Sequence, residues 1–320
     1  MLSSVTDTLR QLPGLFSNTW APERFHGHGR RPPYFEGWYY KLVDAAGEQR
    51  WAVIPGIFLS EDPERHHAFV QVLDGTTGNA TVHRYPAEAF HAARGAFRVR
   101  VGPNEFGPDR FRLDIDDEQR QLKGEIALVG RVPWPVTPLS PGVMGPFGLI
   151  PVMECYHGVL SLDHGLRGRL TIDGTPRDFT GGRGYLEKDW GKSFPAGYVW
   201  MQTNHFDAPG TSFFGSIAII PWLRRPFAGF LMGMYHHGRL YRFATYTGTV
   251  TERLEITDEH VRWTSRRGRM RLHARAKRAR GGLLLGPTRE DMSSRVGETM
   301  SSAVHVRLTQ ERRGGGRGIF

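Results

Sequence analysis

Short runs of alternating apolar and polar residues, separated by turn-forming residues, recur along most of the chain. Residues 35–43 and 51–59 flank the turn at 44–47, and residues 68–73 and 80–85 flank a second turn rich in Gly and Thr. Alternation with a period of two is typical of strands with one buried face, and turns at this spacing join antiparallel neighbours. The pattern predicts an antiparallel all-β protein with little helix, built from two barrel or sandwich halves.

The same pattern predicts two β domains joined by a proline-rich connection. Residues 1–33 form an irregular lead-in, with a short helix predicted at 4–12, and an N-terminal β domain is predicted over 34–130. The connection at 131–151 holds six prolines among large apolar residues, too many for a central strand. Its apolar side chains indicate a segment packed on the protein, either part of a pocket wall or lid or a crossover without a ligand role. A C-terminal β domain is predicted over 152–320.

Within the C-terminal region, residues 155–162 and 166–172 are predicted to pair as a hairpin. Further strands are predicted at residues 184–190, 198–206, 212–220, 227–236, 240–246, 250–256, 260–264, 269–276 and 303–309.

The amino-acid composition indicates the cellular compartment in which the protein is expected. The 320 residues include one cysteine, Cys155, which allows no intrachain disulfide and no cysteine-based zinc site. Residues 1–16 lack the apolar region of a signal peptide, and no apolar run reaches the roughly 20 residues of a spanning helix. We therefore expect a cytoplasmic protein.

The net charge of +10 is concentrated in an arginine-rich stretch at residues 266–280. Basic residues alternate there with Met270, Leu272 and Ala274, which predicts a strand with one basic face. Such a face suits anionic lipid headgroups or nucleic acid, and it is more commonly the solvated outer face of a barrel strand. No nucleic-acid motif is present, so contact with an anionic membrane surface is the partner retained and nucleic acid is not expected.

One candidate for chemistry is the first predicted strand. Glu36, Trp38 and Tyr40 share one face of it, and Tyr39 and Lys41 share the other. A carboxylate among aromatic side chains is either an acid with a raised pKa beside an apolar ligand or the partner of an arginine at the rim.

A second candidate is the run Tyr185-Leu186-Glu187-Lys188-Asp189-Trp190. Glu187 and Asp189 share a face with Tyr185, whereas Lys188 lies on the face of Trp190. Two neighbouring carboxylates repel, so one is expected to keep its proton near neutral pH if both are shielded. The alternative is an exposed acidic strand end balanced by nearby basic residues.

A third candidate is the strand at residues 198–206, where Trp200, Gln202 and Asn204 share one face. Two amides beside an indole are typical of a ligand-facing wall, and the alternative is an outward polar stripe. Histidine doublets such as His66-His67 have no strong ligand spacing, because neighbours in a strand point to opposite faces. With no phosphate-binding loop present, we predict no metal and no cofactor.

Three segments in order resemble the tocopherol cyclase family. They are Y-F-E-G-W-Y-Y-K at 34–41, G-Y-L-E-K-D-W-G at 184–191 and Y-V-W-M-Q-T-N at 198–204. Between them, W-P-V-T-P-L-S-P-G at 134–142 and M-E-C-Y-H-G at 153–158 are similar to bacterial members. Plant members resemble E-K-N-W-G, with Asn where this chain has Asp189, so Glu187, Lys188 and Glu36 match the family better.

The resemblance implies two lipocalin-like β halves and an isomerase that needs no cofactor. Such an enzyme closes a phenolic hydroxyl onto a prenyl double bond of a prenylated quinol, giving a chromanol. The expected proton donor is Glu187 or Asp189, with Glu36 as the next choice, and Lys188 beside them. The expected substrate contacts are Trp38, Tyr40, Trp190, Trp200, Gln202 and Asn204. The alternatives are a lipocalin-like carrier of isoprenoid lipids and a hydratase of isoprenoid double bonds.

Overall fold

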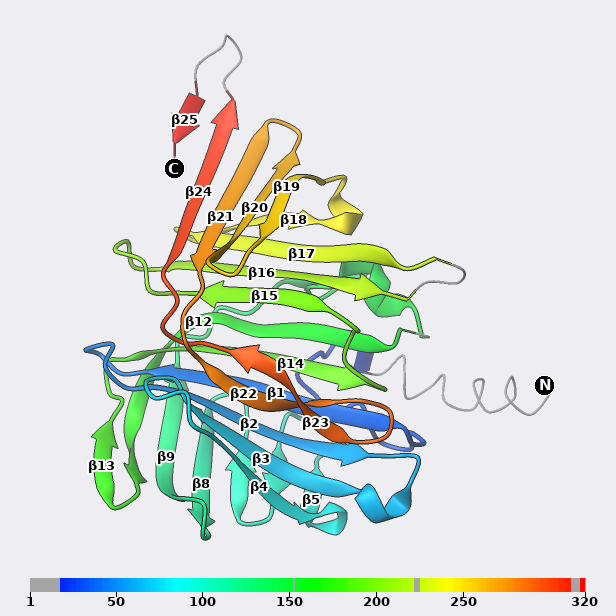
Figure 1. Ribbon diagram of the computed structural model, residues 1–320, viewed down its shortest axis with the longest axis vertical. Helices are drawn as coiled ribbons and strands as arrows, with labels where there is room; N and C mark the ends of the chain where they lie inside the picture. Colours follow the sequence, from blue (N-terminus) through cyan, green and yellow to red (C-terminus); the bar gives the residue numbers. More distant parts are fainter. Residues whose placement is uncertain (1–17, 152, 222–224, 312–316, 320) are drawn as a thin grey trace, which may run out of the picture. The chain divides into compact units, whose positions relative to one another are not determined.

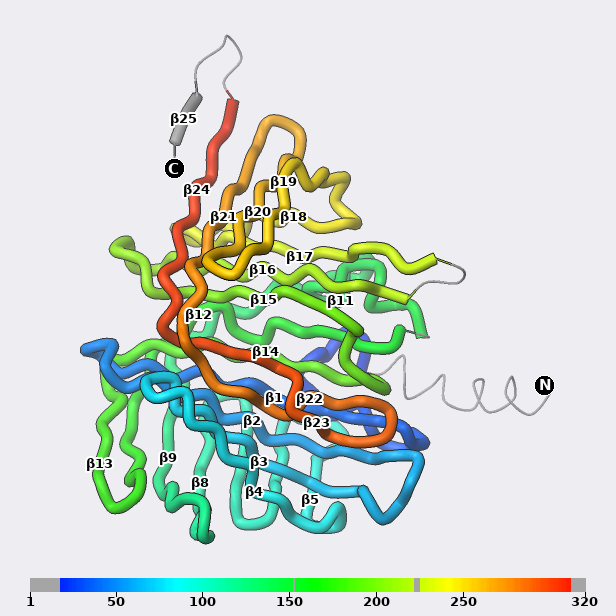
Figure 2. Tube along the Cα trace, in the orientation of Figure 1, coloured from blue at the N-terminus to red at the C-terminus, as the bar shows by residue number. Residues whose placement is uncertain are grey.

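The computed structural model describes residues 18–151, 153–221, 225–311 and 317–319 (Figures 1 and 2). Two compact units are present: the first comprises the residues up to Phe194 together with Gly282–Glu298, and the second comprises Pro195–Gly281 and the residues from Thr299 onward. Strands pair antiparallel throughout the described part, which confirms the predicted all-β class. The short helix predicted at residues 4–12 lies outside the described residues. None of the described helices is long and apolar enough to cross a bilayer.

A twelve-stranded sheet forms the first unit. Its main path runs β4-β3-β2-β1-β14-β12-β9-β8-β7-β6-β5, and β13 pairs with β12 (Figure 1). The strands are β1 (Tyr34–Val43), β2 (Arg50–Leu59), β3 (His67–Asp74), β4 (Ala80–Pro86), β5 (Phe90–Ala92), β6 (Val99–Val101), β7 (Asn104–Phe106), β8 (Arg110–Asp116), β9 (Gln121–Val129), β12 (Cys155–Ile172), β13 (Thr175–Asp178) and β14 (Arg183–Gly191). Two single-turn helices, η1 (Pro63–Arg65) and η2 (Ala87–Ala89), lie between strands.

The core of this unit lies on one face of the sheet. Trp38, Tyr40 and Leu42 of β1 are buried in it, together with Leu186 of β14. The alternation expected for β1 is therefore confirmed, and the residues between these positions lie on the opposite face.

The first unit extends beyond the predicted N-terminal domain. Strand β14 pairs with β1, so it completes the first sheet instead of opening a second domain. The proline-rich stretch lies inside this unit and forms β10 (Val136–Thr137), β11 (Ser140–Pro141) and η3 (Gly145–Leu149). Trp134 and Val143 are buried, so the stretch packs on the protein.

The hairpin predicted at residues 155–172 is wrong, because these residues form one 18-residue strand, β12. Its first part pairs with β14 and its last part with β9. Register shifts between Val159 and His164 absorb the residues that resemble a turn. Asp163 is held there by two hydrogen bonds from the Arg183 guanidinium, at 3.1 and 2.5 Å.

A hairpin that the sequence did not predict returns the chain to the first unit. It comprises β22 (Gly282–Pro287) and β23 (Met292–Glu298). The Gln71 amide donates to the Leu285 carbonyl and accepts from its N–H, at 3.0 and 2.9 Å. Met292 is buried among phenylalanines, including Phe35 of β1, on the sheet face away from the main core. The hairpin thereby places Glu298 in the first unit.

The second unit contains a four-stranded and a five-stranded sheet. The first has the order β15-β16-β17-β18 and the second the order β19-β20-β21-β24-β25. Their buried side chains, among them Met201, Phe213, Trp263 and Leu272, form one core. The elements are β15 (Tyr198–Thr203), β16 (Thr211–Ile220), β17 (Phe227–His236), β18 (Arg239–Ala244), η4 (Thr245–Thr247), β19 (Val250–Ile256), β20 (His260–Arg267), β21 (Met270–Lys277), β24 (Val304–Glu311) and β25 (Arg317–Ile319).

Candidate active site

The predicted site residues of the first unit lie on opposite faces of its sheet. Across β1 and β14, Trp38 is opposite Lys188 and Tyr39 is opposite Glu187. Neighbouring residues of a strand point to opposite faces, so Lys188 shares the core face with Trp38 and Glu187 shares the other face with Tyr39. The alternation predicted for the E-K-D-W-G run is confirmed, and it separates Glu36 and Lys188 from Glu187 and Asp189.

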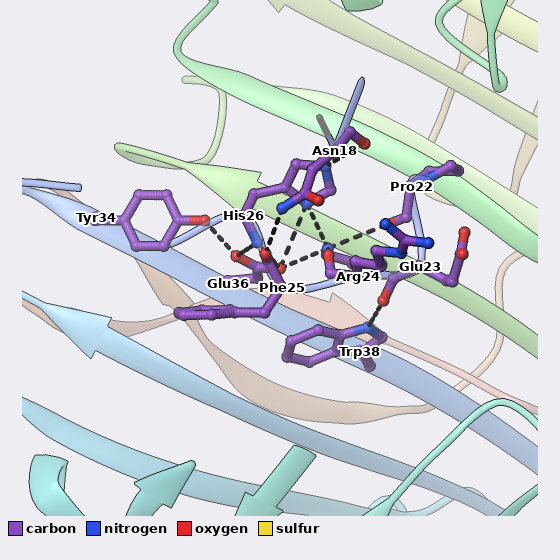
Figure 3. Close-up of polar contacts among 10 residues, drawn as sticks. Asn18, Pro22, Glu23, Arg24, Phe25, His26, Tyr34, Glu36 and Trp38 are labelled. Carbon is purple, nitrogen blue, oxygen red and sulfur yellow. Dashed lines mark hydrogen bonds and ion pairs between the residues drawn. The ribbon is translucent and has the colours of Figure 1, made fainter. Parts of the chain in front are cut away.

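On the core face, Glu36 and Lys188 form a fully buried ion pair with 2.5 Å between Oε1 and Nζ. Both oxygens of Glu36 accept from the backbone N–H of His26, at 3.0 and 2.9 Å, and Oε2 also accepts from the Tyr34 hydroxyl (Figure 3). Lys188 donates to the Pro22 carbonyl at 3.1 Å, to the Arg24 carbonyl and to His26 Nδ1 at 2.7 Å. The pair thus fastens the segment from Pro22 to His26 onto the sheet.

The electrostatics of this pair disfavour proton donation by Glu36. Burial opposes its charged form, but the Lys188 charge and the hydrogen bond with His26 hold the pKa of Glu36 below its usual value. Burial lowers the pKa of Lys188 to about 8, against the attraction of Glu36. At neutral pH the two side chains are therefore a carboxylate and an ammonium.

Two of the aromatic residues predicted on this face, Trp38 and Trp190, lie against the same ammonium. Lys188 Nζ lies 4.9 Å from the centroid of the Trp38 ring and 4.7 Å from that of Trp190. His26 stacks on Trp190 with 4.3 Å between centroids. Tyr40 donates its hydroxyl to the Gly107 carbonyl at 2.8 Å. These contacts indicate structural roles for Trp38, Trp190 and Tyr40, on the face opposite Glu187.

On the other face, Glu187 and Asp189 meet His157, which β12 brings alongside β14. Glu187 is only 5% exposed, and its Oε2 accepts from the Tyr185 hydroxyl at 2.5 Å. His157 Nδ1 lies 2.8 Å from Asp189 Oδ1, and His157 Nε2 lies 3.5 Å from Glu187 Oε2. The imidazole therefore bridges the two carboxyl groups.

The His157 side chain reduces the repulsion expected between Glu187 and Asp189. Burial alone would lower the pKa of His157, but the charges of Asp189 and Glu187 outweigh it and raise that pKa to about 9. His157 is consequently an imidazolium at neutral pH, and its positive charge lies between the two carboxyl groups and offsets their mutual repulsion.

Glu298 is a further carboxyl group on this face, and the sequence did not reveal it. It accepts a hydrogen bond from the hydroxyl of Tyr39, the cross-strand neighbour of Glu187. Burial and the negative charge of Glu187 raise the pKa of Glu298 to about 7, against the effects of Tyr39 and Lys41. Near neutral pH it is divided between acid and carboxylate. Its only sequence signal was the end of a short strand, S-S-R-V-G-E at residues 293–298.

The cluster of His157, Glu187 and Asp189 could also hold a metal ion. One ligand atom from each residue lies within 4.8 Å of the others. The prediction of no metal rests on the histidine doublets, and a histidine that meets carboxylates only through strand pairing has no signal in the sequence. A divalent cation here would have to displace the proton of His157, so its affinity should increase with pH.

The remaining predicted contacts lie on β15 of the second unit or directly after it. Met201 is buried in that unit's core, and Trp200 and Gln202 are half-buried on the opposite face of the strand. Asn204, which follows the strand, is fully buried. The predicted alternation holds within β15, which ends at Thr203 and so does not include Asn204. A substrate role for Trp200, Gln202 and Asn204 stays a prediction.

The raised pKa of His157 predicts a pH-dependent contribution to stability. Its folded pKa of about 9 exceeds the unfolded value of about 6.5, so the stabilisation is complete below about pH 6.5 and is lost as pH rises through about 9. The term is at most about 3 kcal/mol. Thermal unfolding of wild type and His157→Gln at pH 6 to 10 should show a difference in Tm that narrows with increasing pH. A difference that stays constant would contradict an imidazolium at this position.

The fold and these side chains define an antiparallel β protein of two units with a carboxyl–histidine cluster on one sheet face. The tocopherol cyclase-like family profile matches residues 132–320, more than half of the chain. The chain belongs to this family. The matched stretch includes His157, Glu187, Asp189 and Glu298, whereas Tyr39 precedes it.

Individual relatives are distant or only partly matched. The chloroplastic tocopherol cyclase of Zea mays is 33% identical over 90 residues, which cover 26% of this chain and 19% of the relative. A probable chloroplastic tocopherol cyclase of Oryza sativa subsp. japonica is 32% identical over the same shares. The chain thus matches about a fifth of the length of these curated relatives.

Among solved structures, CghA with Sch210972 has a TM-score of 0.54 at 13% identity, covering 90% of this chain and 86% of that chain. This likeness supports the fold. Kievitone hydratase from Nectria haematococca has a TM-score of 0.43 at 11% identity, covering 93% and 92%.

Proposed function

We propose that the chain is a cofactor-independent isomerase of the tocopherol cyclase type, which closes a phenolic hydroxyl onto a prenyl double bond of a prenylated quinol. The observation that carries the proposal is that Glu298 and Glu187 lie on the same sheet face but have different electrostatic environments. Glu298 is partly protonated near neutral pH, whereas the positive charge of His157 lies beside Glu187. Two carboxyl groups that differ in this way can act as an acid and a base.

The proposed roles follow from these environments. Glu298 donates its proton to the less substituted carbon of the prenyl double bond, so a C–H bond forms, the π bond breaks and a tertiary cation results. The phenol oxygen attacks that cation, and Glu187 accepts the phenolic proton. One proton enters the product and one leaves it, so product and substrate are isomers. Holding both reacting groups in one bound molecule lowers the entropic cost of ring closure.

This assignment differs from the sequence expectation in which Glu187 is the donor. The sequence placed Glu187 next to Asp189 but could not place His157 between them. With a cation on that side, Glu187 is better suited to accept a proton, and Glu298, beside the Tyr39 hydroxyl, is better suited to give one. After turnover, the proton can return from Glu187 to Glu298, with Tyr39 beside both on the route.

A direct test is incubation of the purified protein with a panel of prenylated quinols in D₂O. The proposal predicts a chromanol that contains one carbon-bound deuterium, because the donated proton exchanges with solvent before each turnover. Mass spectrometry checks both the mass and the position of the label. A product heavier by one molecule of water would indicate a hydratase, and tight binding without conversion would favour a carrier.

A further inference from the structure

One face of the five-stranded sheet in the second unit is covered with arginines. Strand pairing aligns Arg262 with Arg275 and His305 in one row, and His273 with Arg307 in the next. The intervening positions point into the core, where Trp263, Leu272, Ala274 and Leu308 are buried. We call the outward set the arginine face, which consists of Arg253, Arg262, Arg266, Arg271, His273, Arg275, His305 and Arg307.

Acidic residues neutralise only one end of the arginine face. Glu252 accepts from Arg266 at 2.9 Å and from Arg271 at 2.6 Å. Glu255 pairs with Arg253 and lies 3.9 Å from Arg262. Toward β24, no carboxylate of the described residues lies within 4.0 Å of Arg275 or Arg307, and both side chains are exposed. The face therefore has excess positive charge on its β21–β24 side.

The environment of His273 reflects this charge. Burial lowers the pKa of His273, and the charges of Arg307, Arg253, Arg262 and Arg275 lower it further. Like charges directly opposite each other destabilise a sheet. Four arginines acting on one imidazole indicate a positive potential that an anionic partner would relieve.

The shape and composition of the face favour lipid headgroups over nucleic acid. The outward positions of β19, β20, β21 and β24 carry no Trp, Tyr or Phe, the side chains on which exposed bases stack. The apolar side chains that the edge strand β19 leaves exposed, Leu254 and Ile256, pair with Trp263 and Val261 and so belong to the opposite face of the sheet. The arginine face is thus basic and free of Trp, Tyr and Phe side chains, which suits electrostatic attachment to anionic lipid headgroups.

We propose that the arginine face binds the surface of membranes that contain anionic lipids, through the charges of Arg275 and Arg307 and their neighbours on β20, β21 and β24. The proposal does not depend on the reaction assigned above. It extends the sequence expectation of a membrane contact by naming the surface and the charges that make it.

The test is co-sedimentation of the full chain with phosphatidylcholine vesicles that contain no, or about a third, phosphatidylglycerol. Wild type should bind the anionic vesicles and release them at high salt, because the attraction is screened. The variant Arg275→Glu/Arg307→Glu should bind at least about tenfold more weakly, since each basic residue near such a surface contributes substantially. The matched control Arg98→Glu/Arg100→Glu makes the same change in net charge at exposed positions of the first unit and should bind as wild type does.

Three outcomes would overturn the proposal. In the first, wild type does not bind anionic vesicles. In the second, Arg275→Glu/Arg307→Glu binds them as well as wild type does. In the third, the control variant loses as much binding as Arg275→Glu/Arg307→Glu, which would mean that the net charge of the chain determines binding and the arginine face does not. Circular dichroism of each variant excludes misfolding as the cause. If wild type does not bind the vesicles but binds a single-stranded oligonucleotide, the partner of the arginine face is a nucleic acid.

Discussion

Glu298→Gln is expected to reduce turnover of a prenylated quinol by about 10²–10⁴, the usual cost of removing a general acid. The amide keeps the size of the side chain and can still accept from the Tyr39 hydroxyl, but it has no acidic proton. Substrate affinity should change little, because the reacting proton contributes little to binding. Steady-state kinetics, with binding measured separately by calorimetry, distinguishes loss of kcat from loss of affinity.

Glu187→Gln tests the electrostatic coupling between Glu187 and Glu298 through the pKa of Glu298. The negative charge of Glu187 helps raise the pKa of Glu298, so its removal should shift ionisation of Glu298 to lower pH. Infrared difference spectra of wild type should show a protonated carboxyl group that titrates near pH 7 and is missing in Glu298→Gln. In Glu187→Gln that signal should disappear at lower pH, and turnover should also fall, because the proton acceptor is gone.

Glu88→Gln is the matched control, because Glu88 is an exposed glutamate of the same unit. It should leave both the infrared titration and turnover unchanged. If Glu298→Gln retains full activity on a substrate that wild type converts, the acid is assigned to the wrong residue. If the infrared titration is as expected but no quinol is converted, the coupled carboxyl pair stands and the proposed substrate is wrong.

The sequence predicted the local part of this site well. Alternation correctly grouped Glu36, Trp38 and Tyr40 on one face of the first strand, and it correctly separated Glu187 and Asp189 from Lys188 in the E-K-D-W-G run. Such information is local, because a strand has a period of two wherever it lies. Most of the strands were predicted for the same reason, from alternation bounded by turns, with the β22–β23 hairpin and the unbroken β12 as exceptions.

The features of the site that the sequence did not predict depend on pairing between segments that are distant in the chain. His157 was noted only within a family motif, and its role appears when β12 aligns it with Asp189. Glu298 lies on a strand whose sequence, M-S-S-R-V-G-E, has little alternation to predict it. Lys188 finds its carbonyl partners at Pro22 and Arg24, in a lead-in that was predicted to be irregular. Register between non-adjacent strands is set by the whole sheet, so one segment cannot reveal it.

The buried pair of Glu36 and Lys188 leads to the largest expected change in stability. Lys188→Met removes the ammonium and leaves the Glu36 carboxylate buried without its counter-ion, which should cost about 3–5 kcal/mol of unfolding free energy. Lys188→Met/Glu36→Gln should recover part of this loss, because a neutral amide at position 36 can still accept from the His26 backbone and the Tyr34 hydroxyl. Urea unfolding of wild type, both single variants and the double variant gives the coupling energy.

Lys123→Met is the control for this cycle. Lys123 and Asp116 also form a close ion pair, 2.7 Å apart, but both side chains are about half exposed. Water compensates an exposed charge that has lost its partner, so this variant should unfold at nearly the wild-type urea concentration. If Lys188→Met were equally mild, the pair would not fasten Pro22 to His26 onto the sheet, and Lys188 would be available for a role in catalysis after all. If instead Lys188→Met is strongly destabilised and the double variant has the same low unfolding free energy, the loss of stability comes from the hydrogen bonds of Lys188 to the Pro22 and Arg24 carbonyls. The unpaired Glu36 carboxylate would then contribute little to it.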